Sequence, residues 1–505
     1  MKFLRNRIFV FLILFIVILS LNGCADDTIP VSGTSTEDQL LAAKSDAIGA
    51  PIPTPLSTPN PTPEPTPEPT PQPRVTLMAL GDDLLHNGIV KEGKQADGSY
   101  NYDFLFNGLT DLIETADISV INQETILGGS EFPFQGYPTF NSPNEVGDAI
   151  IKAGFDVVLH ATNHTLDQGE KGLNNCIAYW KSHPEILMVG IHEPYGTTES
   201  EDGSVIPSSP KDHVQLLTKN GITFAILNYS YGTNLATVPA YARDKMNMLC
   251  YYDPSSGKLD FTKMREEVLE DIAAADEMAD IVIVFPHWGV EYVTDPTIYE
   301  KQFAQQMTQA GADLIIGTHP HVTQPVQWIE ADNGNKALCY YSLGNYVSTQ
   351  KDPITMLENM AWVTFLRTED GVIIDSEGTG SIPIVCHYVY NPLRLERVYL
   401  LEEYSQELAD KHGILPWGGQ KLNYQDLKKW SKEILGDSVK SVYELTGLRE
   451  KNLQKTEEDE TAQEISVPET ENPESVSEEP QSASEGSESS SEDEIRPADE
   501  LEPVG

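Results

Sequence analysis

The 505-residue sequence predicts an α/β fold with mixed sheets, and two observations support this prediction. Between residues 75 and about 320, short apolar runs of strand length alternate with amphipathic segments of helical length. Beyond residue 320 the pattern changes to pairs of strands. Alternation followed by strand pairs is typical of an α/β core that contains both parallel and antiparallel strands.

The first half of this core begins with an apolar strand directly after a proline-rich stretch. The apolar runs 214–217 and 222–228 are predicted to form a hairpin, because they flank the tight-turn sequence Lys219-Asn220-Gly221. The periodicity predicts strands at 75–80, 118–121, 156–160, 188–191, 214–217 and 222–228, and helices at 104–116, 143–155 and 169–182.

The second half continues the alternation and then adds a hairpin around Glu369-Asp370-Gly371. The helical patterns from 401 to 448 are amphipathic and carry no recognisable chemistry, so 401–450 is predicted to be a small helical appendage to a domain at 75–400. The pattern predicts helices at 260–278 and 299–310, and strands at 280–285, 314–316, 337–343, 362–367, 372–376 and 384–390.

Both ends of the chain have the composition of disordered segments. Residues 51–73 repeat Pro with Thr and Glu, which favours polyproline II, so 25–74 is predicted to be a Pro-rich disordered linker. Residues 451–505 hold eighteen acids against three bases and form a predicted acidic disordered tail. The net charge of −45 argues against nucleic acid as a partner.

The amino terminus has the features of an export signal. Three basic residues precede an apolar run at 8–21, and Leu21-Asn22-Gly23-Cys24 follows. This ending resembles the bacterial lipobox, so 1–24 is predicted to be a lipoprotein signal peptide with Cys24 lipidated. An uncleaved anchor helix is the alternative. Both interpretations place the body at the extracellular face of the bacterial cytoplasmic membrane, and the first makes it lipid-anchored.

The remaining cysteines show no Cys-x-x-Cys spacing that would indicate zinc or redox chemistry. We expect Cys176, Cys250, Cys339 and Cys386 to be buried thiols of the core.

Polar side chains follow five of the predicted strands at the point where each strand ends. Because parallel strands share a carboxyl edge, such residues converge there. Carboxylates, amide oxygens and imidazoles together suit one or two divalent ions, with Mn, Zn or Fe(II) plausible. His160 and His387 lie within strands and are predicted to be structural. The strand-end groups are Asp82 with Asp83 and His86; Asn122 with Glu124; Asn163, His164 and Asp167; His287 with Glu291; and His319 with His321.

Each of these residues also has an ordinary interpretation. Asp82 could cap the segment that follows it, and Asn163-His164 could form a turn with a satisfied histidine. His319 and His321 could belong to a surface loop. Five such groups at successive strand ends favour a shared site.

Several motifs together resemble one family, from about residue 75 to 398. They are Gly81-Asp82, Asn122-x-Glu124, Asn163-His164-x-x-Asp167-x-Gly169, His287-Trp288-Gly289-x-Glu291, Gly317-x-His319-Pro320-His321 and Ser342-Leu343-Gly344-Asn345. This ordered set resembles the CapA family of capsule-synthesis proteins linked to poly-γ-glutamate. That family in turn resembles the calcineurin-like metallophosphoesterases.

The resemblance implies a calcineurin-like αββα sandwich with a two-metal site. It implies that Asp82, Glu124, Asn163, His287, His319 and His321 are metal ligands. His164 would be the acid or the group that stabilises an oxyanion. Two departures stand out: the Asp-x-His opening is absent, with His86 as a possible substitute, and Glu124 replaces the usual bridging Asp.

Three functions remain open at this point. The first is a metal-dependent hydrolase-like surface protein for synthesis, export or trimming of an anionic capsule polymer such as poly-γ-glutamate. The second is a non-catalytic accessory subunit whose partners are the subunits of a membrane polymer synthase. The third is an extracellular phosphodiesterase or nucleotidase. No Gly-x-x-x-x-Gly-Lys-Ser/Thr loop is present, so use of ATP by this chain is not expected.

Overall fold

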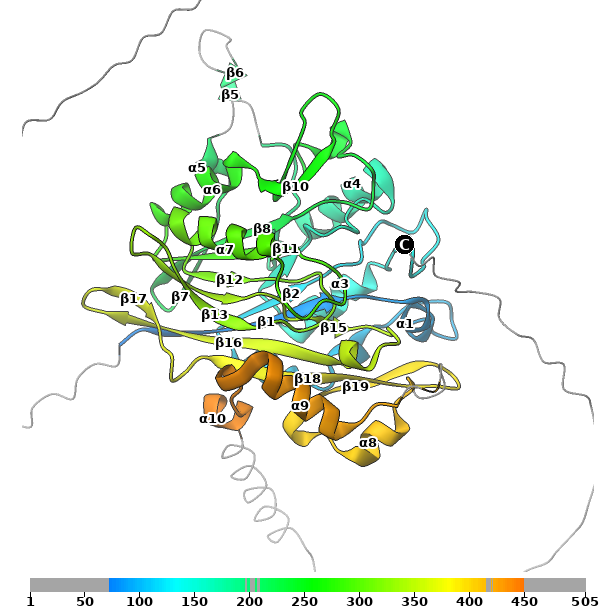
Figure 1. The fold of residues 1–505 in the computed structure, drawn as a ribbon. Helices are drawn as coiled ribbons and strands as arrows, with labels where there is room; N and C mark the ends of the chain where they lie inside the picture. Colours follow the sequence, from blue (N-terminus) through cyan, green and yellow to red (C-terminus); the bar gives the residue numbers. More distant parts are fainter. Residues whose placement is uncertain are drawn as a thin grey trace, which may run out of the picture. The chain divides into compact units, whose positions relative to one another are not determined.

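The computed structural model describes residues 72–195, 198–199, 205–206, 209–414, 419 and 421–448, and it contains two large β-sheets (Figure 1). The predicted signal peptide at 1–24, nearly all of the predicted linker at 25–74 and the predicted tail at 451–505 lie outside these residues.

The larger sheet has nine strands, and its centre is parallel. Its strands are β1 (Arg74–Asp83), β2 (Ile118–Asn122), β3 (Val157–Leu159), β4 (Leu187–Val189), β15 (Asn345–Val347), β16 (Leu357–Thr368), β17 (Gly371–Ile374), β18 (Gly380–Val389) and β19 (Arg394–Leu400). The order is β19-β18-β16-β1-β2-β3-β4, with β15 also paired to β1 and β17 to β16. β1 to β4 run parallel, whereas β16, β18 and β19 are antiparallel to their neighbours.

The smaller sheet has six strands, and its four central strands are parallel. The six strands are β7 (Gln215–Lys219), β8 (Ile222–Ser230), β11 (Ile281–His287), β12 (Leu314–Ile316), β13 (Val326–Glu330) and β14 (Lys336–Tyr340). The order is β13-β14-β12-β11-β8-β7, with antiparallel pairing only at the two edges. The carboxyl ends of β8, β11, β12 and β14 therefore lie at one edge.

The two sheets pack face to face through alternate apolar residues of their strands. Val75 and Leu77 of β1 and Phe224 and Ile226 of β8 belong to one buried cluster between the sheets. The rings of Phe224 and Phe365 meet edge to face at 5.0 Å across this layer. The period of two in a strand leaves the other side chains of β1 and β8 for the outer faces.

Helices cover both outer faces. The outer cluster of the larger sheet contains side chains of α1 (Asn87–Glu92), α2 (Thr110–Thr115), α3 (Glu145–Ala153) and α4 (Gly169–Lys181). The outer cluster of the smaller sheet contains side chains of α6 (Glu266–Asp276) and α7 (Ile298–Ala310), which lie above it in Figure 1. The predicted αββα sandwich of mixed sheets is confirmed.

Short elements complete the described chain. They are η1 (Asp103–Phe106), β5 (Thr198–Glu199), β6 (Val205–Ile206), α5 (Pro210–His213), η2 (Ala240–Ala242), β9 (Cys250–Tyr252), β10 (Leu259–Met264), η3 (Pro353–Met356), η4 (Leu401–Glu403), α8 (Gln406–Lys411), α9 (Tyr424–Leu435), η5 (Gly436–Ser438) and α10 (Val442–Thr446). Ala409 of α8 and Leu427 of α9 pack against Leu357 of β16 and Val385 of β18. Among the helices of the described segments, none combines the length and apolar character needed to cross a bilayer.

Three details differ from the predicted elements. The predicted helix at 104–116 is broken into η1 and α2 around Gly108, where a Cβ atom would lie 2.1 Å from the carbonyl oxygen of Val398. The start of the predicted helix at 260–278 is strand β10, and only 266–276 is helical. Strands β13, β15 and β19 were not predicted, because each is short or carries several polar residues.

The residues predicted to be structural are buried. Cys176, Cys250, Cys339 and Cys386 are free thiols in the core, as expected. His160 accepts a hydrogen bond at 2.6 Å from the indole N–H of Trp180, and burial lowers its pKa to about 3. His387 lies 2.6 Å from the hydroxyl of Tyr404, also inside the protein.

Candidate metal centre

Strands of both sheets bring the predicted ligands to one buried place. Asp82 lies near the end of β1, and Glu124 follows β2 by two residues. His287 is the last residue of β11, while His319 and His321 follow β12. These five residues are at most 3% exposed, although three carry imidazoles and two carry carboxylates. So many ionisable groups are buried together only where they pair with one another or bind a cation.

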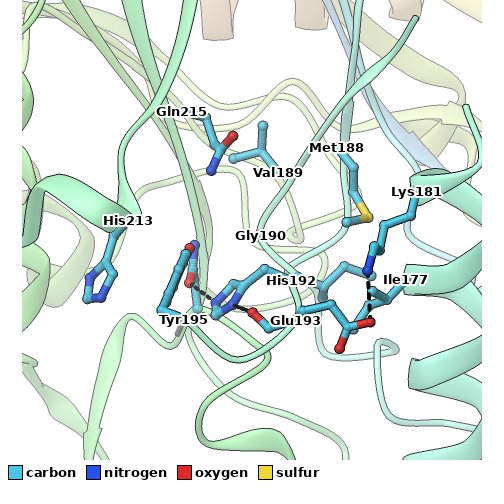
Figure 2. Close-up of a pocket in the computed structure, with 12 residues that line it drawn as sticks. Ile177, Lys181, Met188, Val189, Gly190, His192, Glu193, Tyr195, His213 and Gln215 are labelled. Atoms are coloured by element: carbon cyan, nitrogen blue, oxygen red, sulfur yellow. Dashed lines mark hydrogen bonds and ion pairs between the residues drawn. The ribbon is translucent and has the colours of Figure 1, made fainter. Parts of the chain in front are cut away.

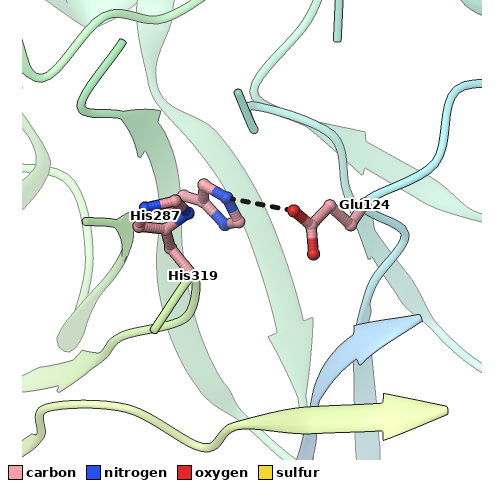
Figure 3. A group of neighbouring side chains, drawn as sticks. All are labelled: Glu124, His287 and His319. Atoms are coloured by element: carbon pink, nitrogen blue, oxygen red, sulfur yellow. Dashed lines mark ion pairs between the residues drawn. The ribbon is translucent and has the colours of Figure 1, made fainter. Parts of the chain in front are cut away.

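Two overlapping groups have ligand atoms close enough to bind a metal ion. Glu124, His287 and His319 offer three atoms that lie within 4.8 Å of one another (Figure 3). Asp82, Glu124 and His321 form the second group by the same measure. Glu124 belongs to both, so its two carboxylate oxygens can serve two neighbouring ions. The family resemblance implies a bridging position of this kind for Glu124.

The unpaired atoms of this cluster fit a cation. Neither carboxylate oxygen of Glu124 has a hydrogen-bond partner among the described residues, and both are buried. The same holds for Nδ1 of His319 and for Oδ1 of Asn122. Leaving a buried acceptor unpaired costs about 1–3 kcal/mol. Carboxylate oxygen and imidazole nitrogen are ordinary ligands of zinc and of other first-row divalent metals, so the donor set is suitable.

The electrostatics of the cluster reflect its burial. Burial, followed by the charge of Asp82, raises the pKa of Glu124 well above 4.5. Burial and the neighbouring imidazoles lower the pKa values of His287 and His319 well below 6.5. Burial alone would lower the pKa of His321, but the charges of Glu124 and Asp82 outweigh it and raise the pKa to about 9. The two carboxylates thus attract positive charge, while two of the imidazoles remain neutral ligand donors.

The turn after β12 is held in an unusual backbone conformation. His319 has φ +99° and His321 has φ +56°, in the left-handed region that non-glycine residues seldom adopt. The amide of His319 donates to Oδ2 of Asp82 at 3.1 Å, and Nδ1 of His321 lies 2.9 Å from Oδ1 of Asn345. These contacts tie the turn to Asp82 of β1 and to Asn345 of β15. Strained residues of this kind are common at functional sites.

Asn163 adjoins the first group. Its amide oxygen lies 2.7 Å from Nε2 of His287, and its amide nitrogen donates to Oδ1 of Asn234 at 3.1 Å. The other ring nitrogen of His287 lies 2.9 Å from the hydroxyl of Thr318. The structure therefore places the Asn163 oxygen beside the candidate ligand atoms, where the sequence predicted it.

His164 lies at the side of the cluster with one ring nitrogen directed to it. Its Nδ1 is 2.7 Å from Oδ2 of Asp167, and its Nε2 is 4.0 Å from Oε1 of Glu124. Phe140 packs edge-on against the imidazole at a centroid distance of 4.7 Å. Asp167 also accepts a hydrogen bond from the amide of Phe140 at 2.7 Å. This arrangement fixes the orientation of the imidazole, as carboxylates do for histidines that transfer protons in known active sites.

Asp83 and His86 belong to neither metal-binding group. The pairing of β1 is irregular between Asp82 and Asp83, and the charge of Asp83 acts on Tyr346 and Cys386 of the outer cluster. Burial in the core raises the pKa of Asp83 to about 8. His86 accepts a hydrogen bond from the amide of Thr349 at 3.2 Å and packs on Phe140. His86 is therefore not a member of the cluster, but it lies behind the phenyl ring that contacts His164.

Sequence reasoning missed the loop that follows β8. Tyr231 packs on His319 at a ring-centroid distance of 4.5 Å, and the amide nitrogen of Asn234 lies 3.0 Å from Nδ1 of His164. The predicted strand stopped at residue 228, before these residues. The polar residues after the longer strand, which ends at Ser230, are the signal that could have revealed them.

A cavity of about 280 Å³ lies elsewhere, near the end of β4 (Figure 2). None of the predicted ligands lines it. One wall consists of stacked rings, with His192 and Tyr195 at 3.8 Å and Tyr195 and His213 at 4.4 Å. His213 is paired with Asp271 at 2.8 Å. The cavity is thus distinct from the candidate metal centre.

Fold and site together define an α/β sandwich protein with a buried candidate centre for divalent cations at the strand ends. Comparison with known proteins assigns the chain to a particular family. Residues 76–350 match the family described as bacterial capsule synthesis protein PGA_cap, and the chain belongs to this family. The CapA resemblance seen in the motifs is confirmed.

Two curated relatives carry capsule names. The chain is 32% identical over 235 residues to the PGA biosynthesis protein CapA of Bacillus subtilis (strain 168), covering 46% of this chain and 50% of that protein. It is 25% identical over 305 residues to the capsule biosynthesis protein CapA of Bacillus anthracis, covering 60% of this chain and 66% of that protein. The match thus spans half of the first relative and just under two thirds of the second.

Among solved structures, the chain overlaps a Staphylococcus aureus protein described as a 5′-nucleotidase, in complex with alpha-ketoglutarate. Sequence identity is 12%, the overlap covers 71% of this chain and 58% of that one, and the TM-score is 0.35. A likeness at this level establishes nothing about activity.

Proposed function

We propose that this protein is a metal-dependent hydrolase that acts on an anionic capsule polymer, such as poly-γ-glutamate, or on a phosphoester linked to it. The single observation that supports it best is Glu124, which belongs to two adjacent metal-binding groups and whose two buried oxygens have no hydrogen-bond partner among the described residues. Family membership supports a role in capsule synthesis. The names of the two relatives suggest poly-γ-glutamate as the polymer.

The chain's own residues account for most of what such a reaction needs. Glu124, His287, His319 and Asn163 would hold one divalent ion, and Asp82, Glu124 and His321 a second. When bound, such ions polarise the scissile group and lower the pKa of water. His164 would donate a proton from Nε2 to the leaving group, while Asp167 holds the opposite ring nitrogen.

We propose further that the protein works at the extracellular face of the cytoplasmic membrane, anchored by lipidated Cys24. The Leu21-Asn22-Gly23-Cys24 sequence supports this location. The proline-rich composition of the residues that follow is also typical of a spacer between an anchor and a folded domain.

Metal analysis followed by a substrate screen tests this function. The purified full chain is loaded with Mn²⁺, Zn²⁺ or Fe²⁺, and hydrolysis of phosphodiester and γ-glutamyl substrates is measured. Metal-dependent turnover that disappears in His164→Ala supports a hydrolase. Restoration of capsule in a deletion strain by the His164→Ala variant would instead show that the chain acts as a non-catalytic subunit of a membrane polymer synthase.

A further inference from the structure

The segment Ser342-Leu343-Gly344-Asn345 leads from the end of β14 in the smaller sheet to β15 in the larger one. Asn345 is the first residue of β15, and it pairs with Asp82 of β1 in the parallel register. It is fully buried. Asn345 is therefore a backbone neighbour of the second metal-binding group, which consists of Asp82, Glu124 and His321.

The contacts of the Asn345 side chain determine which way its amide group faces. The amide nitrogen donates to the backbone carbonyl of His321 at 3.3 Å, to the hydroxyl of Ser348 at 3.3 Å and to the side-chain oxygen of Gln350 at 3.0 Å. A carbonyl oxygen can only accept, so the nitrogen belongs on this side of the amide. The amide oxygen, Oδ1, lies on the other side, 2.9 Å from Nδ1 of His321.

Three oxygens surround this same ring nitrogen of His321. Besides Oδ1 of Asn345, Oδ2 of Asp82 lies 3.2 Å from Nδ1 and Oε2 of Glu124 lies 3.9 Å from it. Nδ1 is thus the ring nitrogen that faces both carboxylates of the group. An imidazole nitrogen that binds a metal ion carries no proton, so it cannot also donate to Asn345. The buried amide oxygen would then lack this partner unless it binds the same ion.

The backbone at Asn345 is held in place by a second buried residue. The amide of Asn345 donates to Oε2 of Glu358 at 2.6 Å, and Glu358 is fully buried in β16. Gly344 has φ +74°, and a Cβ atom at this position would lie 2.0 Å from the same carboxylate oxygen. The close approach of Glu358 therefore requires glycine directly before Asn345.

The first metal-binding group contains a contact of the same kind. Oδ1 of Asn163, an implied ligand, lies 2.7 Å from Nε2 of His287. With Asn163 the first group has four candidate ligands, whereas the second has three. The second group is one short because the Asp-x-His opening is absent and His86 lies outside the cluster, against Phe140.

We propose that Asn345 is the fourth protein ligand of the second metal-binding group and binds a divalent cation through Oδ1, in place of the absent Asp-x-His histidine. This rests on the two-ion centre of the proposed function, but not on hydrolysis. The second group would then offer three oxygens and one nitrogen, and the first group two of each. Oxygen ligands suit harder ions, so the second group favours Mn²⁺ over Zn²⁺ more strongly than the first does.

Stepwise binding of Mn²⁺ to the full chain tests the proposal, with calorimetry for affinity and plasma emission for metal content. Asn345→Ala should weaken the second ion about 10- to 100-fold or more, since loss of a group that only orients a ligand already costs that much. Asn345→Asp keeps an oxygen donor and adds a charge, so it should bind the second ion at least as tightly as the parent. Parental affinities in Asn345→Ala, or equal weakening in both variants, would overturn the proposal.

Asn359→Ala is the matched control. Asn359 is also fully buried, on β16, but its amide donates to the hydroxyl of Ser381 at 3.2 Å, and it belongs to neither metal-binding group. This variant should bind both ions with parental affinity.

Histidine-selective ¹⁵N NMR of the Zn²⁺-loaded parent separates a ligand from a group that only orients His321. The signals of His321 are identified by their absence from the spectrum of His321→Ala. Zn²⁺ bound at Nδ1 supports the proposal, because Asn345 then has no proton to accept from this nitrogen. A proton on Nδ1 with Zn²⁺ at Nε2 would make Asn345 a hydrogen-bond acceptor and overturn its assignment as a ligand.

These measurements also separate this proposal from the proposed function, because none of them requires turnover. A parent chain that binds no divalent ion would overturn the two-ion centre, and with it both proposals. Binding of two ions that depends on Asn345, without hydrolysis of any substrate, would overturn the hydrolase function alone.

Discussion

Replacing Glu124 with Gln should remove metal binding while making the metal-free protein more stable. Both effects follow from the same atoms, because the two carboxylate oxygens are buried and have no hydrogen-bond partner among the described residues, the nearest imidazole nitrogen lying 3.6 Å away. In the metal-free protein they incur an unsatisfied-acceptor penalty of about 1–3 kcal/mol. In the metal-bound protein they would be shared ligands of both groups.

The stability difference between metal-free Glu124→Gln and the metal-free parent should depend on pH with a definite sign. The pKa of Glu124 is raised in the folded state, so the folded protein binds this proton more tightly than the unfolded chain. The penalty for the ionised group is therefore absent below the unfolded pKa near 4.5 and grows as the pH rises above it. The difference in unfolding free energy between Glu124→Gln and the parent, both metal-free, should widen from pH 5 to pH 8.

The metal-linked effect can be estimated by mass action. At a thousandfold excess over Kd, one bound ion stabilises the folded state by about 4 kcal/mol. With an unfolding entropy of about 2.1 cal/mol/K per residue over roughly 370 residues, this corresponds to a rise in Tm of about 5 °C. Differential scanning fluorimetry with Mn²⁺ and with a chelator should show this shift in the parent and little of it in Glu124→Gln.

Glu300→Gln is the matched control. Glu300 is also buried, but it belongs to the capping box of α7, and Gln can replace Glu in such a box. This variant should keep the full metal-dependent shift. A Glu124→Gln protein that shows the parental shift and the parental metal content would refute the assignment of Glu124 as a shared ligand.

Three further outcomes are expected. His319 and His321 belong to different metal-binding groups, so His319→Ala and His321→Ala should each lower the metal content by about one ion per chain, as measured by plasma emission analysis. Unchanged metal content in both variants would show that neither histidine binds metal. His164→Ala should lower kcat about 10²- to 10⁴-fold with metal content retained, whereas loss of metal in this variant would make His164 a ligand instead. Cys24→Ala should release the protein from the membrane fraction after signal cleavage, as followed by immunoblotting; continued tethering with an intact amino terminus would favour an anchor helix.

Much of the fold could be predicted from the sequence because its parallel strands are buried on both faces. Runs such as 314–316 and 281–285 are apolar throughout, and each is followed at once by polar residues that proved to be neighbours. Strand β10 was misread because Asp260 and Lys263 expose their side chains in a pattern that also fits a helix. Strand β13 is an edge strand whose mixed residues give no clear period.

The candidate site was predicted less completely than the fold. The strand-end rule found Asp82, Glu124 and the three histidines, since parallel strands bring their carboxyl ends together. The rule could not decide which of two adjacent residues faces the site, and so it grouped Asp83 with Asp82. It also missed Asn234, which lies on a loop whose path depends on contacts distant in sequence.

The left-handed turn at His319 and His321 has a consequence for how quickly a cation could be captured. In each residue the left-handed backbone conformation costs on the order of 1–2 kcal/mol. This cost is part of the free energy of folding, so it is not added when an ion binds. The imidazoles are then already aimed, so association would involve little rearrangement of the protein.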